Sequence, residues 1–273
     1  MKPLFSIIIP CYNDGKYLPD AIESLRSCDA SLFELIIVND GSKDEATITY
    51  LKQLEIEGYT VIHQQNKGLS GARNTGISKS LGKYIVPLDS DNKLRPEYLL
   101  RAKTVLENDE NIAVVYGRPQ HFGANSEVPQ VGYFNLQRLM LGNYIDACAI
   151  YRKAVWEQAG GYDEQMRLGL EDWEFWLRLA FNGYKFHFIN EVLFDYRVRP
   201  DSMARTDTTD RYNSIVSYVE EKHKYFMSFD AVSTYFRIKY KGNYIIFMLK
   251  MLLYMKFHKL FDIIMKKGFI RKL

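Results

Sequence analysis

Two aspartates follow a short apolar segment and could together bind a divalent cation. Residues 84–88 are largely apolar and suit a buried strand, and Asp89 and Asp91 come directly after them. Side chains at positions i and i+2 of an extended segment point the same way, so both carboxylates could face one ligand. Carboxylate oxygens on a short loop suit a cation that bridges phosphates. A polar turn before the helix that Pro96 begins is the alternative interpretation.

Other polar residues follow two earlier apolar segments. Tyr12 comes after residues 5–10 and offers an aromatic ring, and Asp40 comes after residues 33–38. Asp40 could accept hydrogen bonds from a base or a ribose, and Gly41 would let the backbone approach a ligand. In isolation, an ordinary turn is the better explanation of the stretch at Tyr12, and an Asx-turn explains Asp40 about as well as binding does.

A glycine-rich segment, residues 68–76, carries one long cation, Arg73. Small residues there would let a helix approach a sheet, and Arg73 could stabilise an anion or reach a nucleobase. A surface charge on the helix is the alternative. The segment is not a Walker A motif, because the Gly-Lys-Ser/Thr ending is missing. It is not a dinucleotide fingerprint either, because it does not follow the first strand.

Two acids, Glu171 and Asp172, stand at the start of a helix predicted over 172–182. Free N–H groups and the helix dipole favour carboxylates there, so simple capping is one interpretation. The dipole also predicts that Asp172 is ionised at neutral pH, since its reference pKa is about 3.9 and the dipole lowers it. Beside Trp173 or Trp176 in a cleft, that carboxylate could take a proton from a sugar hydroxyl.

Alternating strands and helices must position these residues. Apolar segments and periodic stretches predict strands over 5–10, 33–38, 60–64, 84–88, 112–116 and 186–189, and helices near 18–25, 44–54, 70–80, 153–159 and 172–182, with another from Pro96. This order predicts an α/β fold with a doubly wound, mostly parallel sheet. The stretch 117–129, with its Gly and Pro residues, predicts a loop at the edge of a cleft.

The composition is that of a globular protein, with 47% hydrophobic and 25% charged residues. Aromatic residues make up 14% of the chain, which predicts rings in a binding cleft or at a membrane surface. Cys11, Cys28 and Cys148 have neither paired nor metal-type spacing, so we expect no disulfide or zinc site and a reducing cytoplasm. The apolar run 4–9 is too short for a secretory signal.

Basic residues concentrate at the C-terminus. Residues 235–273 have a net charge of about +9, and the remainder about −6. An apolar helical stripe with flanking lysines is formed by Phe257, Leu260, Phe261 and Ile264. It predicts a peripheral membrane contact through 243–273, and the alternative is a helical pair packed on the protein or in a homodimer. Residues 243–255 are too few for a transmembrane span.

Taken together, six motifs resemble the family 2 glycosyltransferases of the GT-A fold. They are Ser-Ile-Ile-Ile-Pro-Cys-Tyr-Asn from Ser6, Val-Asn-Asp-Gly-Ser from Val38, Gly-x-x-x-Ala-Arg-Asn-x-Gly from Gly68, Leu-Asp-Ser-Asp-Asn from Leu88, Gly-Gly-Tyr-Asp-Glu from Gly160 and Glu-Asp-Trp-Glu-Phe-Trp from Glu171. The resemblance covers roughly residues 4–200 and follows the family's order. It implies an enzyme that transfers a sugar from a nucleotide-sugar donor to a hydroxyl with inversion, using Mn²⁺ or Mg²⁺ on the diphosphate.

By position, the resemblance also implies a role for each residue. Pro10 and Tyr12 would line the nucleoside pocket, Asp40 would bind the base, and Arg73 would contact the base or its surroundings. Asp89 would hold the ribose or donor sugar and join Asp91 at the metal. Asp172 would be the general base, with Glu171 the weaker candidate. Two departures stand out: Asn92 replaces a common acid, and Arg199 lies where many relatives carry a metal-associated His. Arg199 cannot ligate a metal, but it could pair with the diphosphate.

We therefore expect an inverting hexosyl- or N-acetylhexosaminyl-transferase that uses a UDP-sugar and acts on a glycan or lipid-linked acceptor in surface polysaccharide synthesis. A sugar nucleotidyltransferase and a non-catalytic nucleotide-sugar-binding subunit at the membrane are the alternatives. Nucleic acid is not an expected partner, because the basic residues lie in an apolar tail. We expect a catalytic domain over 1–205, a joint near 201–210 and a helical extension over 206–273. The expected location is cytoplasmic, at the inner face of the plasma membrane.

Overall fold

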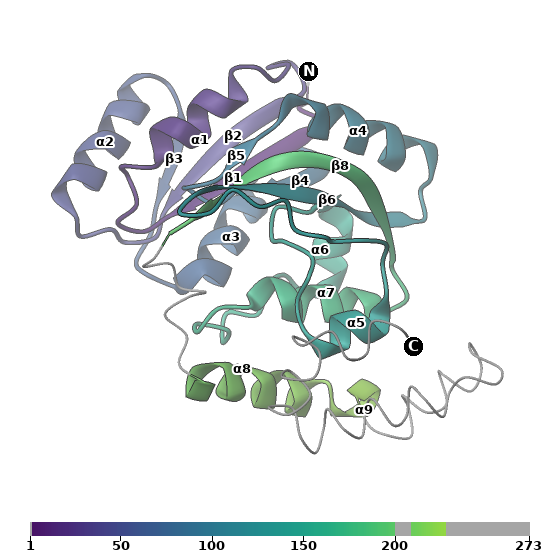
Figure 1. The fold of residues 1–273 in the computed structure, drawn as a ribbon. Helices are drawn as coiled ribbons and strands as arrows, with labels where there is room; N and C mark the ends of the chain where they lie inside the picture. The colour runs from purple at the N-terminus through teal and green to yellow at the C-terminus, as the bar shows by residue number, and fades with distance from the viewer. Residues whose placement is uncertain (1, 200–208, 228–273) are drawn as a thin grey trace, which may run out of the picture. The chain divides into compact units, whose positions relative to one another are not determined.

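The strands within residues 2–199 form one eight-stranded sheet (Figure 1). The computed structural model describes residues 2–199 and 209–227. The strands are β1 (Phe5–Cys11), β2 (Phe33–Asn39), β3 (Thr60–His63), β4 (Tyr84–Pro87), β5 (Lys93–Leu94), β6 (Ile112–Gly123), β7 (Ile150–Arg152) and β8 (Lys185–Val198). Their order across the sheet is β3-β2-β1-β4-β7-β6-β8-β5, so β1 to β4 build one half and the remaining strands build the other.

The half of the sheet that consists of β1 to β4 is parallel. β1 pairs in parallel with both β2 and β4, and β2 pairs in parallel with β3. In the other half, β7 pairs antiparallel with β4 and β6, β6 pairs in parallel with β8, and β5 pairs antiparallel with β8. Parallel strands end at the same edge, so the residues that follow β1, β2 and β4 lie along one edge. The expected α/β fold with a mostly parallel sheet is confirmed.

Helices lie on both faces of this sheet. The helices of the described residues are α1 (Leu18–Leu25), α2 (Glu45–Ile56), α3 (Gly68–Lys79), α4 (Pro96–Asn108), α5 (Leu136–Leu141), α6 (Lys153–Ala159), α7 (Glu171–Phe181), α8 (Thr209–Lys222) and α9 (Lys224–Met227). α1 and α4 lie on one face, and α3, α6 and α7 lie on the other (Figure 1). Pro19 and Pro96 occupy the first turns of α1 and α4, where a missing N–H costs nothing.

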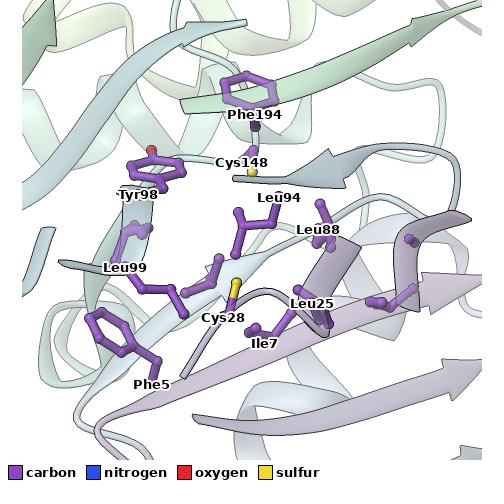
Figure 2. Packing of buried hydrophobic residues seen from close by; sticks show 14 of the residues in the cluster. Phe5, Ile7, Leu25, Cys28, Leu88, Leu94, Tyr98, Leu99, Cys148 and Phe194 are labelled. Carbon is purple, nitrogen blue, oxygen red and sulfur yellow. The ribbon is translucent and has the colours of Figure 1, made fainter. Parts of the chain in front are cut away.

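The apolar core between the sheet and helices α1 and α4 joins segments that are distant in sequence. Figure 2 shows part of this cluster, whose members include Phe5 of β1, Leu25 of α1, Tyr98 of α4 and Phe194 of β8. The Tyr98 and Phe194 rings stack with centroids 6.4 Å apart. All three cysteines are buried free thiols. This core therefore fixes the strands whose ends carry the polar loops.

Helix α3 lies close to the opposite face of the sheet because of Gly76. A Cβ atom at this position would come within 2.6 Å of Ile8 Cγ2 and 3.0 Å of Val38 Cγ2. A side chain would push α3 away from β1 and β2, and would move Arg73 with it. The expectation that small residues of this segment face the sheet is confirmed.

Two strands are longer than the sequence predicts. β6 continues to Gly123 and β8 covers Lys185–Val198, where only 112–116 and 186–189 were expected. The two pair in parallel with register shifts between Tyr116 and Pro119, which hide the alternation of side chains. The loop predicted over 117–129 is therefore wrong for residues 117–123. β5, β7 and α5 are too short to give a periodic signal.

The first compact unit of the chain ends at Val216, and the second begins at Ser217. The joint predicted near 201–210 lies mostly outside the described residues, and the predicted stripe over 257–264 lies entirely outside them. Within 2–199 and 209–227, no helix has both the length and the apolar composition that a bilayer crossing requires.

Candidate active site

The loop after β1 is tied to the loop after β2. Asn13 has a left-handed backbone with φ of 57°, and its side-chain oxygen accepts hydrogen bonds from the backbone N–H groups of Lys43 (2.7 Å) and Asp44 (3.0 Å). Pro10 is buried within β1, whereas the Tyr12 ring beyond the end of the strand is 45% exposed. The carboxyl edge of the sheet thus presents an accessible ring on an anchored loop.

Asp40 connects the end of β2 to the start of α3. Its Oδ1 accepts hydrogen bonds from the Gln64 side-chain amide (2.6 Å) and the Lys67 backbone N–H (2.8 Å), and its Oδ2 accepts one from the Gly68 N–H (2.9 Å). The carboxylate is almost fully buried. It satisfies N–H groups that the first turn of a helix otherwise leaves unpaired. The sequence did not reveal this role, because Asp40 is far from α3 along the chain.

Arg73 joins the acidic loop after β4 to the start of α7. Its guanidinium donates one hydrogen bond to Asp89 Oδ1 at 2.7 Å and another to Glu171 Oε1. The side chain is only 1% exposed, so Arg73 is not the surface charge that was one interpretation of the sequence. Buried guanidinium groups require such charged partners. Two motifs 82 residues apart, at Asp89 and Glu171, are therefore held together by one buried cation.

Asp91 of the acidic loop pairs with Arg199 at the end of the described first segment. Its Oδ2 lies 3.0 Å from Arg199 Nε, and Arg199 Nη1 donates to Asp14 Oδ1 at 2.9 Å. Burial and the nearby charge of Asp89 raise the pKa of Asp91 to about 6, although Arg199 opposes the shift. One arginine therefore does not fully compensate the negative charge of this loop.

Asn92 fastens the acidic loop to the end of β8. Its side-chain oxygen accepts a hydrogen bond from the Arg197 backbone N–H at 2.9 Å, and Arg197 Nε donates to the Asp91 carbonyl at 3.0 Å. Asn92 is 1% exposed. Asn92 is therefore a buried amide that accepts a backbone hydrogen bond without adding charge to the loop.

Asp172 lies in the first turn of α7 and is almost fully buried. Its Oδ1 accepts from the Trp173 backbone N–H at 2.8 Å, and its Oδ2 accepts from the Asn143 side-chain nitrogen at 2.7 Å. Burial and the adjacent Glu171 raise the pKa of Asp172 to about 8. The expectation that the helix start lowers the pKa of Asp172 is therefore wrong, because desolvation and like charge outweigh the dipole.

Sequence reasoning missed two residues of the segment before β7, Asn143 and Asp146. Asp146 Oδ1 accepts from the Cys148 N–H at 2.8 Å. Burial and the charge of Asp89 raise the pKa of Asp146 to about 7, so it lies close to the acidic loop in space. These residues stand in an irregular stretch with no periodicity, so only the fold brings them to the site.

The acidic loop suits a divalent cation that also binds substrate phosphates. No group of three His, Cys, Asp or Glu side chains converges as a complete metal site among the residues that the structure describes. Mg²⁺ needs only one or two carboxylates where phosphates supply further oxygens. Asp89 raises the pKa of Asp91, so a bound cation would relieve their repulsion. The carboxylate oxygens of Asp89 and Asp91 therefore suit a divalent cation as ligands.

An α/β sheet with an acidic loop at its carboxyl edge and carboxylates at a nearby helix start is the architecture of GT-A glycosyltransferases. The family described as "Glycosyl transferase family 2" matches residues 6–160. The chain belongs to this family and is a glycosyltransferase, so the family expectation is confirmed. This result favours glycosyl transfer over the nucleotidyltransferase alternative.

Relatives and solved structures agree with this assignment. An uncharacterized glycosyltransferase of Haemophilus influenzae is 30% identical over 81% of this chain and 77% of its own length. A chondroitin synthase of Escherichia coli is 28% identical over 71% of this chain but only 29% of its own length. Polysaccharide synthases are thus among the homologues.

Two structures share the fold at low identity. Staphylococcus aureus TarS 1-349 in complex with UDP-GlcNAc has a TM-score of 0.67 and 20% identity, and the match covers 89% of this chain and 75% of TarS 1-349. The Pyrobaculum calidifontis mannosyltransferase PcManGT, in complex with GDP-Man and Mn²⁺, has a TM-score of 0.58 and 15% identity, over 81% of this chain and 69% of its own. Nucleotide-sugar binding occurs in both structures, and a divalent metal is present in one of them.

Proposed function

We propose that this glycosyltransferase moves a sugar from a UDP-sugar to a hydroxyl of a glycan or lipid-linked acceptor in surface polysaccharide synthesis, with inversion. The arrangement of Asp172 relative to the acidic loop is the observation that carries the proposal. Arg73 holds Asp89 and Glu171 at once, and Glu171 is adjacent to Asp172. A base at α7 and a diphosphate site after β4 therefore share one buried anchor.

Asp172 is the proposed general base, ahead of Glu171. In a single displacement, Asp172 accepts the proton of the acceptor hydroxyl while that oxygen bonds to C1 of the sugar. The bond between C1 and the diphosphate oxygen breaks, and the nucleoside diphosphate leaves. Glu171 is a poorer candidate because its carboxylate forms a buried ion pair with Arg73, whereas the hydrogen-bond partners of Asp172 are neutral groups. A base with a pKa near the working pH suits this reaction, and the pKa of Asp172 is raised to about 8.

The carboxyl ends of β1 and β2 form the proposed nucleoside pocket. The exposed Tyr12 ring is available to stack on a base, and Pro10 shapes the strand behind it. Asp40 fixes the start of α3, and we propose that it contacts the base from that position. Arg73 supports the sugar side of the pocket through Asp89. TarS in complex with UDP-GlcNAc supports the choice of donor class.

Asp91 and Asp89 would hold Mn²⁺ or Mg²⁺ together with the donor diphosphate. When bound, the cation neutralises charge on the departing diphosphate. Arg199 lies beside Asp91, so its guanidinium can also pair with a phosphate oxygen of the bound donor. Asn92 keeps the loop in place through its bond to β8.

A donor panel tests the proposal most directly. Purified protein is given UDP- and GDP-sugars with candidate acceptors, with and without Mn²⁺, and release of nucleoside diphosphate is measured. We expect release from a UDP-sugar that needs the acceptor, is stimulated by the metal and is abolished in Asp172→Asn. Turnover of Asp172→Asn near the wild-type rate would exclude Asp172 as the base, and pyrophosphate release from a nucleoside triphosphate would exclude glycosyl transfer as the main activity.

For the whole chain, we propose a catalytic part over 1–205 and an extension over 206–273 that contacts the inner face of the membrane through 243–273. The ten basic residues after position 234 support this proposal. Flotation of the full chain with anionic and neutral vesicles tests it. Binding to anionic vesicles alone is expected, whereas a dimer with no vesicle binding would support the packing alternative.

A further inference from the structure

Asn143 faces the Asp172 carboxylate from outside α7. Its side-chain nitrogen donates to Asp172 Oδ2 at 2.7 Å, while Oδ1 accepts from the Trp173 backbone at 2.8 Å. The Asn143 oxygen accepts from the Ile145 N–H at 3.3 Å, so the amide is oriented with its NH₂ group toward the carboxylate. Both oxygens of Asp172 are therefore held by hydrogen bonds from defined directions.

Two indole rings of α7 hold the segment that carries Asn143. Trp173 Nε1 donates to the Leu139 carbonyl at 2.6 Å, and Trp176 Nε1 donates to the Ile145 carbonyl at 3.1 Å. Both tryptophans are fully buried, where an indole N–H needs a partner. These bonds lie on either side of Asn143 in the chain. The helix that carries Asp172 therefore also determines where Asn143 sits.

The surroundings of Asp172 mostly oppose its ionisation. The titratable groups that face it are Glu171 on α7, Arg73 on α3, Asp146 before β7, Tyr162 before α7 and Tyr196 on β8. Glu171 and Asp146 repel a charged Asp172, and Arg73 attracts it. The hydrogen bond from Asn143 also favours the ionised form, because an amide N–H binds a carboxylate more strongly than a carboxylic acid.

We infer that Asn143 is a positioning residue for the glycosyl transfer, because it orients the Asp172 carboxylate and stabilises its ionised form. The inference rests on the proposed function, in which Asp172 takes the acceptor proton. The inference predicts that loss of the Asn143 side chain changes the titration of Asp172. A disruption of the same segment away from Asn143 would not produce this change.

The test compares Asn143→Ala and Asn143→Asp with a matched control, Asn135→Ala. Asn135 belongs to the same segment and caps α5 through the Arg138 N–H (3.0 Å), with no bond to Asp172. Two properties are measured against pH: kcat/KM for nucleoside diphosphate release, and the ¹³C carboxyl NMR signal of Asp172, identified by its loss in Asp172→Asn. Affinity for UDP is measured in parallel.

In Asn143→Ala we expect the Asp172 titration and the rising limb of kcat/KM to move upward by about one pH unit, a tenfold change in acidity. Asn143→Asp, which places an acceptor where the donor was, should shift both further. UDP affinity should stay unchanged, and Asn135→Ala should titrate like the wild type. Wild-type titration in both Asn143 variants would overturn the inference. Activity retained in Asp172→Asn would refute the proposed base instead, and the NMR titration would still decide the role of Asn143.

Discussion

Replacing Arg73 by Met should destabilise the protein more than removal of any ordinary surface ion pair. The guanidinium is 1% exposed and Glu171 is 4% exposed, so the variant leaves a carboxylate buried without its cation. Breaking a buried pair by removing one partner costs about 3–5 kcal/mol. Asp89 is 31% exposed and can be solvated by water, so most of the loss comes from Glu171.

Urea denaturation followed by tryptophan fluorescence measures this loss. Arg95→Met is a matched control, because Arg95 pairs with Asp195 at the same 2.7 Å but the two side chains are 37% and 24% exposed. We expect the control to lose less than about 1 kcal/mol. In Arg73→Met/Glu171→Gln the unpaired charge is gone, so part of the stability should return, with a coupling energy of about 1–3 kcal/mol. If the double variant loses the sum of the two single losses, Arg73 and Glu171 do not act as a pair and the reasoning fails.

Three further predictions concern the same site. The pKa of Asp172 is raised to about 8 in the folded protein, against about 3.9 in an unfolded chain, so ionisation favours unfolding and stability falls as pH rises between these values. Asp172→Asn should therefore raise the thermal midpoint more at pH 8.5 than at pH 5. An equal gain at both pH values would contradict the shift. Asp91→Asn should weaken Mn²⁺ binding in the presence of UDP at least tenfold in calorimetry, and unchanged binding would remove Asp91 from the metal site. Gly76→Val should lower the free energy of unfolding by about 1–3 kcal/mol through overpacking against Ile8, as measured by urea denaturation. Gly183→Val is the control, because Gly183 has open space around it and only its positive φ would strain the variant. The control should leave UDP affinity unchanged.

The order of strands and helices could be predicted because each of the first strands is a continuous apolar run followed by a turn. Residues 5–10 and 84–88 became β1 and β4, and their pairing followed from the rule that βαβ units form parallel sheets. The later half was predicted less well. β6 and β8 pair across register shifts, and β5 and β7 have two and three residues, so their patterns carry little signal.

The candidate site was only partly visible in the sequence. The positions of Asp40, Asp89, Asp91 and Asp172 followed from the ends of strands and the start of a helix. Their partners did not, because the contacts of Arg73 with Glu171 and of Asn143 with Asp172 join residues that are 98 and 29 positions apart. The direction of the pKa shift of Asp172 was predicted wrongly for the same reason. Local dipole arguments omit the burial that the other elements impose.

The shared anchor at Arg73 explains how the glycine-rich helix start contributes to the candidate active site even though it lacks a Walker A motif. Gly76 lets α3 pack closely against the sheet, and this packing sets the position of the Arg73 side chain. From that position, the guanidinium binds both Asp89, beside the proposed metal ligand, and Glu171, beside the proposed base. A single displacement requires the acceptor oxygen and the leaving diphosphate to lie on opposite sides of one carbon, so the distance between base and metal must be fixed. A rigid, charge-paired bridge between the two loops meets that requirement better than two loops held independently.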